Sequence, residues 1–315
     1  MTYQFIPLDD RAVLHISGDD RAEFLQGLIT NDITQLTPQH SLFAALLSAQ
    51  GKFQFDFFLS ADADGFLLET DRARLPALQR LLSLYKLRSR VTLTPMSDAV
   101  VAALTGGNIA AHFGLCATVG SAITLHVPQG QLWLCIDPRH AAMGVRVIAQ
   151  SQAALDAFEQ AHGLERQPFT TYEMHRLQEG IPEGSRDAVV DHTLLLENGY
   201  DALNGISFTK GCYVGQEVTA RSKHRATLRK RLCRVTATQT LPAATTTLMA
   251  GEREIGEMRS SCGMMGMALV RLDMMRQALH QEQTITADGI ALEASPLWWH
   301  PPEASDDEAQ TSINE

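Results

Sequence analysis

The chain has 315 residues, 45% of them hydrophobic and 20% charged, with a formal net charge of −10. This length predicts about two domains with a large core, the composition excludes disordered, collagen-like and disulfide-scaffold proteins, and the net charge argues against a polyanionic partner. The start of the chain lacks a basic segment followed by an apolar run, and no apolar run reaches the roughly 20 residues that span a bilayer. The sequence therefore predicts a cytoplasmic protein that does not contact a membrane.

Hydrophobic patterning predicts alternating strands and helices up to about residue 180. Apolar residues fill most of 42–49 before the turn Gln50-Gly51, and they recur at every second position of 53–59 after it. This pattern predicts a hairpin. Helical periodicity ends at Gly180, just before Pro182. The predicted strands cover 12–16, 42–49, 53–60, 65–70, 89–94, 99–104, 122–127 and 131–136, and the predicted helices cover 21–30, 74–87, 151–163 and 170–180. Because the rhythm is not strictly βαβ, the predicted class is α+β rather than a doubly wound sheet.

The pattern changes at about residue 226. From there short strands follow one another closely, with one helix near 274–279, which is typical of a small barrel or sandwich. The last segment begins with two prolines, is acidic and has no apolar period, which predicts disorder. We therefore expect an α+β body over 1–225, a β-barrel over 226–300 and a disordered acidic tail over 301–315.

Positive charge is concentrated in one segment. Residues 210–234 contain eight lysines and arginines and a single acid, Glu217. Such a segment makes a local positive field that attracts anions. An ordinary solvated surface of strand and loop explains the same charges, and the sequence leaves both interpretations open.

The five cysteines are odd in number and include no CxxC pair, which indicates a reducing compartment and no zinc or dithiol redox site. His192 and His224 have no second ligand at metal-binding spacing, so no metal site is expected. Four cysteines have apolar neighbours and are expected to pack as small hydrophobic side chains, namely Cys116, Cys135, Cys233 and Cys262. Cys212 has a different setting.

Cys212 lies between two glycines, Gly211 and Gly215. Glycine permits positive φ and close backbone approach, so the chain can fold tightly around a bound group here. A cation beside the sulfur, from Lys210 or Arg221, would favour the thiolate and make Cys212 a better nucleophile or metal ligand. A structural turn with a half-buried cysteine explains the same residues equally well. Further polar contacts are available from Tyr213, Gln216 and Glu217.

The segment 210–217, KGCYVGQE, resembles the signature of the YgfZ family, folate-binding relatives of the aminomethyltransferase of the glycine cleavage system. Four other blocks resemble the family in the same order along nearly the whole chain. They are LHISGDDRAEFLQGLITNDI at 14–33, AQGKFQFDFFL at 49–59, RLQEGIPEG at 176–184 and IGEMRSS at 255–261. The cysteine motif is the most specific of these blocks.

The resemblance implies an aminomethyltransferase-like, folate-binding α+β body of two lobes, followed by a C-terminal β-barrel. It implies tetrahydrofolate or a folate derivative as ligand, and the basic segment could hold the carboxylates of a polyglutamate tail. It also implies an accessory factor for the assembly or repair of iron–sulfur clusters, similar to mitochondrial assembly factors. Such a factor would work with iron–sulfur proteins or their assembly machinery, affect transfer-RNA modification indirectly, and depend on the motif thiol of Cys212.

Carried over residue by residue, the resemblance implies Cys212 and Asp56 as catalytic residues. Asp56 keeps the carboxylate that acts on the folate nitrogen in true aminomethyltransferases, whereas Gln178 replaces the glutamate that holds the pterin and can offer only an amide. The implied folate contacts are Asn31, Asp32, Arg88, Gln178, Lys210, Tyr213, Gln216, Glu217 and Arg221. Plainer interpretations are a helix-terminal turn for 31–32, a solvated acid on a polar strand face for Asp56, and a surface cation for Arg88.

Two other functions remain open from the sequence. One is folate-dependent one-carbon (aminomethyl) transfer with Asp56 as acid or base, and Gln178 weakens it. The other is nucleic-acid binding through the basic segment, which the lack of interleaved aromatic residues makes the poorer hypothesis. The sequence does not decide whether the chain turns over a substrate, nor its oligomeric state, and it favours the iron–sulfur maturation factor.

Overall fold

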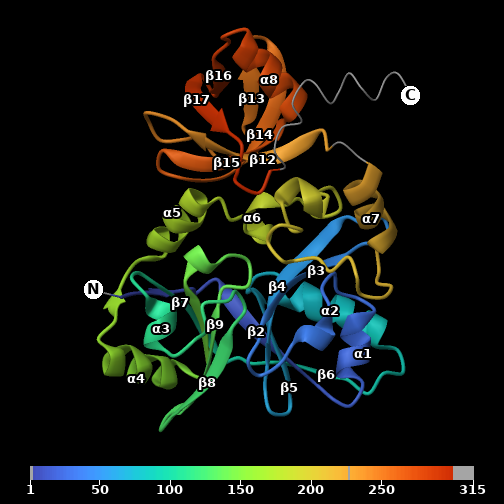
Figure 1. The fold of residues 1–315 in the computed structure, drawn as a ribbon, viewed down its shortest axis with the longest axis vertical. Helices are drawn as coiled ribbons and strands as arrows, with labels where there is room; N and C mark the ends of the chain where they lie inside the picture. The colour runs from blue at the N-terminus through green and yellow to red at the C-terminus, as the bar shows by residue number, and fades with distance from the viewer. Residues whose placement is uncertain (1–2, 226–227, 301–315) are drawn as a thin grey trace.

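The computed structural model describes residues 3–225 and 228–300, without the side chains of residues 224 and 225. Figure 1 shows a body with two lobes, each built on one β-sheet, and a barrel that sits above both. The tail predicted over 301–315 lies outside the described residues. No helix in the described part of the chain is long and apolar enough to cross a membrane.

The first lobe contains a five-stranded antiparallel sheet in the order β3-β4-β5-β2-β6. The predicted hairpin around Gln50-Gly51 joins its two strands β3 and β4. One face of the sheet packs under the helices of this lobe, around Leu25, Phe57 and Leu78. The strands are β2 (Arg11–Ser17), β3 (Leu42–Leu47), β4 (Phe53–Ala61), β5 (Gly65–Asp71) and β6 (Thr92–Pro95), and the helices are α1 (Arg21–Gln26), η1 (Ile33–Gln35) and α2 (Leu75–Lys86).

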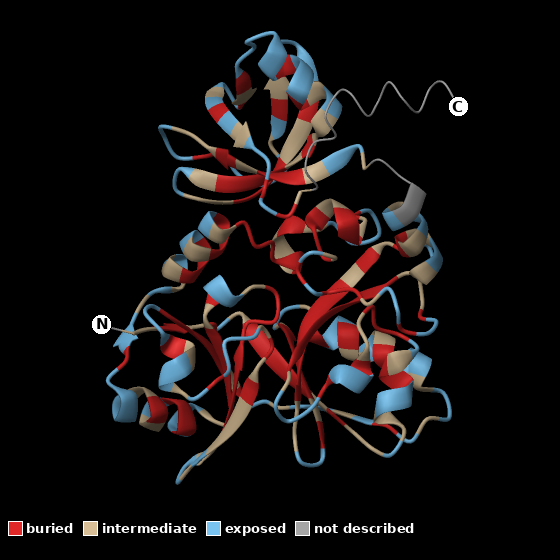
Figure 2. Ribbon diagram, in the orientation of Figure 1, coloured by how far each residue is buried: buried red, intermediate tan, exposed pale blue. Residues whose placement is uncertain are grey.

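The second lobe contains a six-stranded sheet in the order β11-β1-β7-β10-β9-β8. Its central strands β7 and β10 read as short apolar runs because they are buried on both faces, as Figure 2 shows for much of the centre of the body. The strands are β1 (Gln4–Pro7), β7 (Val100–Thr105), β8 (Ala122–Val127), β9 (Gly130–Ile136), β10 (Val145–Ala149) and β11 (Glu165–Arg166), and the helices are α3 (Ile109–His112), η2 (Ala141–Met143) and α4 (Gln152–His162).

A layer of short helices separates the two sheets from the barrel (Figure 1). It consists of α5 (Phe169–Glu179), α6 (Gly184–Asp187), η3 (Leu195–Asn198) and α7 (Gln216–Arg225). The helix α5 ends at Gly180, as the sequence predicts. The interpretation of the basic segment 210–234 as a surface of strand and loop holds only in part, because residues 216–225 form a helix and β12 begins at Lys230.

The C-terminal elements form a closed barrel in the order β12-β15-β14-β13-β16-β17. Its elements are β12 (Lys230–Thr236), β13 (Thr247–Ala250), β14 (Arg253–Cys262), β15 (Met265–Arg271), α8 (Leu272–His280), β16 (Ile285–Ala287) and β17 (Ile290–Ser295). The indole of Trp299 donates to the carbonyl oxygen of Gly180 at 3.0 Å, and Leu232 and Met267 share a buried cluster with Leu177 of the body. The barrel is therefore fixed to the body, and the predicted α+β class with a C-terminal barrel is confirmed.

Candidate functional site

The side chain of Lys210 anchors the cysteine motif to the first lobe. Its ammonium donates to the carbonyl oxygens of Gln26, Ile29 and Asn31 at 2.8, 2.7 and 2.7 Å. These three acceptors use all three donors of an ammonium group. Burial lowers the pKa of Lys210 to about 8, so the group is still mainly charged at neutral pH and keeps this geometry.

Asn31 and Asp32 lie in the segment to which Lys210 is bound, and their side chains form hydrogen bonds that hold this segment in place. The amide of Asn31 donates to the carbonyl oxygens of Phe43 and Asn204, both at 2.8 Å. Asp32 caps the short helix η1. Burial opposes ionisation of Asp32, but hydrogen bonds from Thr34 and the nearby charge of Lys210 outweigh it and lower the pKa of this carboxyl. The plainer interpretation of 31–32, a helix-terminal turn, describes Asp32, whereas the amide of Asn31 joins this turn to more distant parts of the chain.

Two glycines, far apart in the sequence, bring the predicted hairpin and the cysteine motif into contact. Gly51 and Gly215 both have positive φ, +71° and +82°. A Cβ on Gly51 would lie 2.6 Å from Cβ of Val218, and a Cβ on Gly215 would lie 2.7 Å from the carbonyl oxygen of Ser48 and 3.1 Å from Cα of Gly51. The hairpin turn and the motif loop can therefore pack together only because both positions lack a side chain.

Replacing Gly51 with alanine should destabilise the protein by about 2–4 kcal/mol, because the positive φ costs about 1 kcal/mol and overpacking adds about 1–3 kcal/mol. Gly114 is the matched control, with a φ of +72° and no atom within 4 Å of its added Cβ. Gly114→Ala should therefore show only the first cost. Urea unfolding of both variants measures the difference, and equal losses would show that the contact between the hairpin and the motif is not tight.

The thiol of Cys212 is exposed on this anchored loop. The cations expected to assist it have other partners, because Lys210 donates to three carbonyls and Arg221 pairs with Glu217 at 2.6 Å. Tyr213 is buried, with its ring 5.1 Å from the ammonium of Lys210, and Gln216 begins α7. The loop thus presents an accessible sulfur on a fixed base, and activation of that sulfur by Lys210 or Arg221 stays a prediction.

The five thiols should differ in their reaction with iodoacetamide at pH 8. Burial raises the pKa of Cys135 and Cys233 to about 12, so only about one in ten thousand of these thiols is ionised. Cys212 should therefore be alkylated while these two remain unmodified, as peptide mass spectrometry can measure. Cys116 was expected to be packed, but it is exposed and provides the internal comparison. Faster labelling of Cys116 than of Cys212 would show that the motif adds no reactivity.

Asp56 is not a solvated acid on a polar strand face, as the sequence suggested. It is only 6% exposed and accepts hydrogen bonds from the hydroxyl of Tyr200 at 2.9 Å and the backbone NH of Gly184 at 3.1 Å. Burial raises the pKa of its carboxyl, the neighbouring Glu183 adds to the effect, and Arg11 opposes it. The strand is covered on both faces, so the alternation of its side chains did not indicate which one faces water.

Asp56 borders a buried network of charges between the two sheets that the sequence analysis missed. Arg146 contacts both Glu69 and Asp137, and its guanidinium lies 3.9 Å from the centre of the Phe58 ring. The network has three cations and three acids, all at most 5% exposed, which are Arg11, Arg139, Arg146, Glu69, Asp137 and Glu183. Its charges neutralise one another, so the network fills the centre of the body with paired groups.

The remaining predicted folate contacts lie elsewhere. Arg88 lines a hollow of about 900 Å³ with residues of α1 and the end of α2, such as Phe24. Gln178 is exposed on α5 and lines a hollow of about 380 Å³ with Met174. Figure 1 places α5 and α1 on opposite sides of the body. The implied folate residues therefore do not surround one space, and they do not fit a folate held between Asp56 and Gln178.

Within the described residues, no three His, Cys, Asp or Glu side chains are grouped so that they could hold a metal ion.

Comparison with known proteins identifies both the fold and the relatives of this chain. The family model described as CAF17, C-terminal beta-barrel domain, matches residues 229–301. The glycine cleavage system aminomethyltransferase T of Bartonella henselae has a similar structure, with a TM-score of 0.70 and 15% identity over 95% of this chain and 86% of that one. This likeness shows the fold.

The sequence relatives are named as iron–sulfur cluster assembly factors. The human mitochondrial iron–sulfur cluster assembly factor IBA57 is 35% identical over 93% of this chain and 84% of its own length, and the mouse protein is 34% identical over the same shares. Because these relatives are named as mitochondrial, the predicted cytoplasmic location is contradicted. The predicted resemblance to assembly factors is confirmed, although these relatives do not carry the narrower YgfZ name. The chain belongs to the family of the IBA57 iron–sulfur cluster assembly factors.

Proposed function

We propose that this chain assists the assembly or repair of iron–sulfur clusters on other proteins, and that the thiol of Cys212 makes its direct contact with the cluster or its carrier. The observation that carries the proposal is the position of this thiol. It is exposed on a loop whose two ends are fixed by Lys210 and by the packing of Gly215 against Gly51. Thiolates are the usual ligands of iron–sulfur clusters.

One sulfur cannot hold a cluster alone, because clusters of this kind have four protein ligands. With no group of metal-binding side chains around it in the described residues, Cys212 would share the cluster with a second protein. The thiol loses its proton when it binds iron, and a thiolate of the client protein displaces it when the cluster moves on. This exchange of thiolate ligands needs no oxidant or reductant.

The proposal does not need a folate at Asp56. The buried carboxyl and the paired charges beside it argue against a catalytic folate there, and the same observations disfavour aminomethyl transfer. Binding of tetrahydrofolate elsewhere remains a prediction, which calorimetry on the purified chain tests. No heat at millimolar tetrahydrofolate would remove folate from the function. An effect on transfer-RNA modification would be indirect, through an iron–sulfur enzyme that carries out the modification.

A deletion strain tests the central proposal. Cells that lack this chain should lose activity of iron–sulfur enzymes while enzymes without iron keep theirs, and the wild-type gene should restore the loss. Unchanged iron–sulfur enzyme activities under conditions that demand new clusters would contradict the proposal.

A further inference from the structure

Three neighbouring hollows form a strip that runs from η3 and α7 onto the barrel. The first, of about 410 Å³, is lined by Lys223 and Arg231, and the second, of about 480 Å³, by Arg229 and Arg276. The third, of about 370 Å³, contains Lys230. Neighbouring hollows share a lining residue, Leu228 between the first two and Arg271 between the last two. We call this surface the basic strip.

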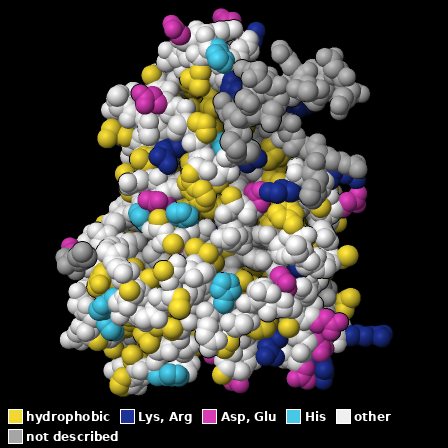
Figure 3. All heavy atoms as spheres, in the orientation of Figure 1, with side chains coloured by type: hydrophobic (Ala, Val, Ile, Leu, Met, Phe, Trp, Pro, Cys, Tyr) yellow, Lys and Arg dark blue, Asp and Glu magenta, His cyan; other side chains and the backbone are white. Residues whose placement is uncertain are grey.

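The basic strip has a positive charge although the chain as a whole has a formal charge of −10. Seven lysines and arginines line the three hollows against four acids, Asp201, Glu254, Glu257 and Asp273. Figure 3 shows lysine and arginine side chains along the junction of barrel and body, with acidic side chains among them. The net charge of +3 contrasts with the acidity of the rest of the chain and attracts an acidic surface.

The acids in the strip are partly paired, and two of its exposed cations form no ion pair with another described side chain. Asp201 pairs with Lys223 at 2.7 Å, and Asp273 pairs with Arg271 at 3.3 Å. Arg229 and Lys230 are exposed and form no ion pair with another described side chain. These two are therefore the cations most available to a partner.

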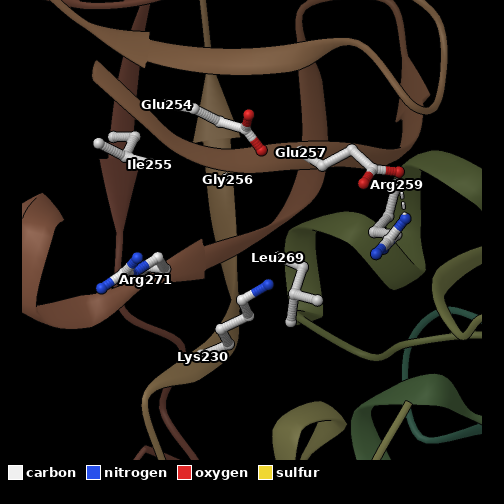
Figure 4. A pocket seen from close by; sticks show the side chains of 8 residues that line it. All are labelled: Lys230, Glu254, Ile255, Gly256, Glu257, Arg259, Leu269 and Arg271. Carbon is white, nitrogen blue, oxygen red and sulfur yellow. Dashed lines mark hydrogen bonds and ion pairs between the residues drawn. The ribbon is translucent and has the colours of Figure 1, made fainter. Parts of the chain in front are cut away.

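The hollow that contains Lys230 has both signs of charge. Figure 4 shows Lys230 and Arg271 on one side of this hollow and Glu254 and Glu257 on the other. A dashed line joins Glu257 to Arg259. An occupant must therefore present mainly acidic groups together with some basic or neutral ones, as the surface of a folded protein does.

We infer that the basic strip docks an acidic face of a partner protein. This inference rests on the proposed function, because α7, which contributes Lys223, directly follows the loop that presents Cys212. A partner held on the strip is thereby brought to the side of the thiol. Nucleic acid fits less well, because the interspersed acids repel phosphates and Trp299, which lines the first hollow, is only 7% exposed and cannot stack on a base.

Binding of a fluorescein-labelled deca-glutamate peptide, followed by fluorescence anisotropy, tests the inference on the full chain. The affinity of the wild-type chain should fall about tenfold between low and physiological salt, because exposed charges are screened. Arg229→Glu combined with Lys230→Glu should weaken binding at least about tenfold at low salt. The matched control is Arg80→Glu combined with Lys86→Glu on α2, which makes the same change in net charge and should weaken binding less than about twofold.

Further variants separate this inference from the proposed function and from other occupants. Cys212→Ser should bind the peptide as the wild type does, so a failure of the thiol hypothesis leaves this result untouched. Equal weakening by both charge-reversed pairs would overturn the inference. So would tighter, strip-dependent binding of a 20-nucleotide RNA. A severalfold gain in affinity on truncation after His300 would assign the strip to the acidic residues 301–315 of the chain itself, and would also overturn it.

Discussion

Replacing Arg146 with methionine should lower the free energy of unfolding by about 3–5 kcal/mol, because the change leaves the buried network with one negative charge that no cation balances. Glu69 and Asp137 are each 1% exposed and both contact the Arg146 guanidinium. The lost guanidinium also packs over the ring of Phe58 at 3.9 Å. Urea unfolding monitored by circular dichroism measures the loss, and a fall in the midpoint at unchanged slope would show that the folded state is the one affected.

Two variants control this prediction. Arg166 pairs with Glu159 at 2.7 Å but is 52% exposed, so Arg166→Met should cost less than about 1 kcal/mol. Adding Glu69→Leu to Arg146→Met should recover part of the loss, because Arg11 keeps Glu183 and Arg139 keeps Asp137. If Arg146→Met lowered the free energy of unfolding no more than Arg166→Met does, the pairing of the buried charges would not stabilise the fold.

The hairpin, the helix that ends at Gly180 and the barrel could all be predicted from local patterns. The turn Gln50-Gly51, the αL cap at Gly180 and the close spacing of short strands after 226 are signals within a few residues of each other. Cys212 could be singled out for the same reason, because its two glycines mark a tight loop. Motifs of this kind consist of residues that are neighbours in the chain, so they can be recognised in a single sequence.

The contact between Gly51 and Gly215 and the buried charges could not be predicted this way. Both depend on residues that are far apart in the sequence and meet only in the folded chain. A weak signal existed for the charges, since Arg146 interrupts the otherwise apolar strand β10 and Glu69 directly follows the apolar residues 66–68 of β5. An acid or arginine inside such a strand needs a partner across the core, but the pattern does not say which one.

The position of the charged network has a consequence for function. In this aminomethyltransferase-like fold, the centre of the body is filled by paired charges, while the accessible thiol lies at the edge of the first lobe, on a loop held by Lys210. The body then acts as a rigid base for the loop. Chemistry at an exposed loop suits a protein that must meet other proteins, because a buried centre admits only small ligands.

Replacing Cys212 with serine should abolish rescue of iron–sulfur enzyme activity in a strain that lacks the chain. Serine is nearly isosteric, but its hydroxyl stays protonated at neutral pH and is a poor ligand for iron, so the contact between the loop and the cluster would be lost. The fold should be unaffected, because Cys212 is exposed and its anchors are the side chain of Lys210 and the glycine contact. Enzyme activity in extracts, normalised to the amount of each enzyme, measures the effect.

Cys116→Ser is the matched control, since Cys116 is the other fully exposed thiol among the described residues. It should rescue as well as the wild type does, at equal protein levels and equal unfolding midpoint. If Cys212→Ser also rescued fully, the exposed sulfur would have no direct role, and the contacts of Lys210, Gly51 and Gly215 would serve only to shape the loop. A loss in both variants would indicate that exposed thiols in general, rather than the cysteine motif, sustain the activity.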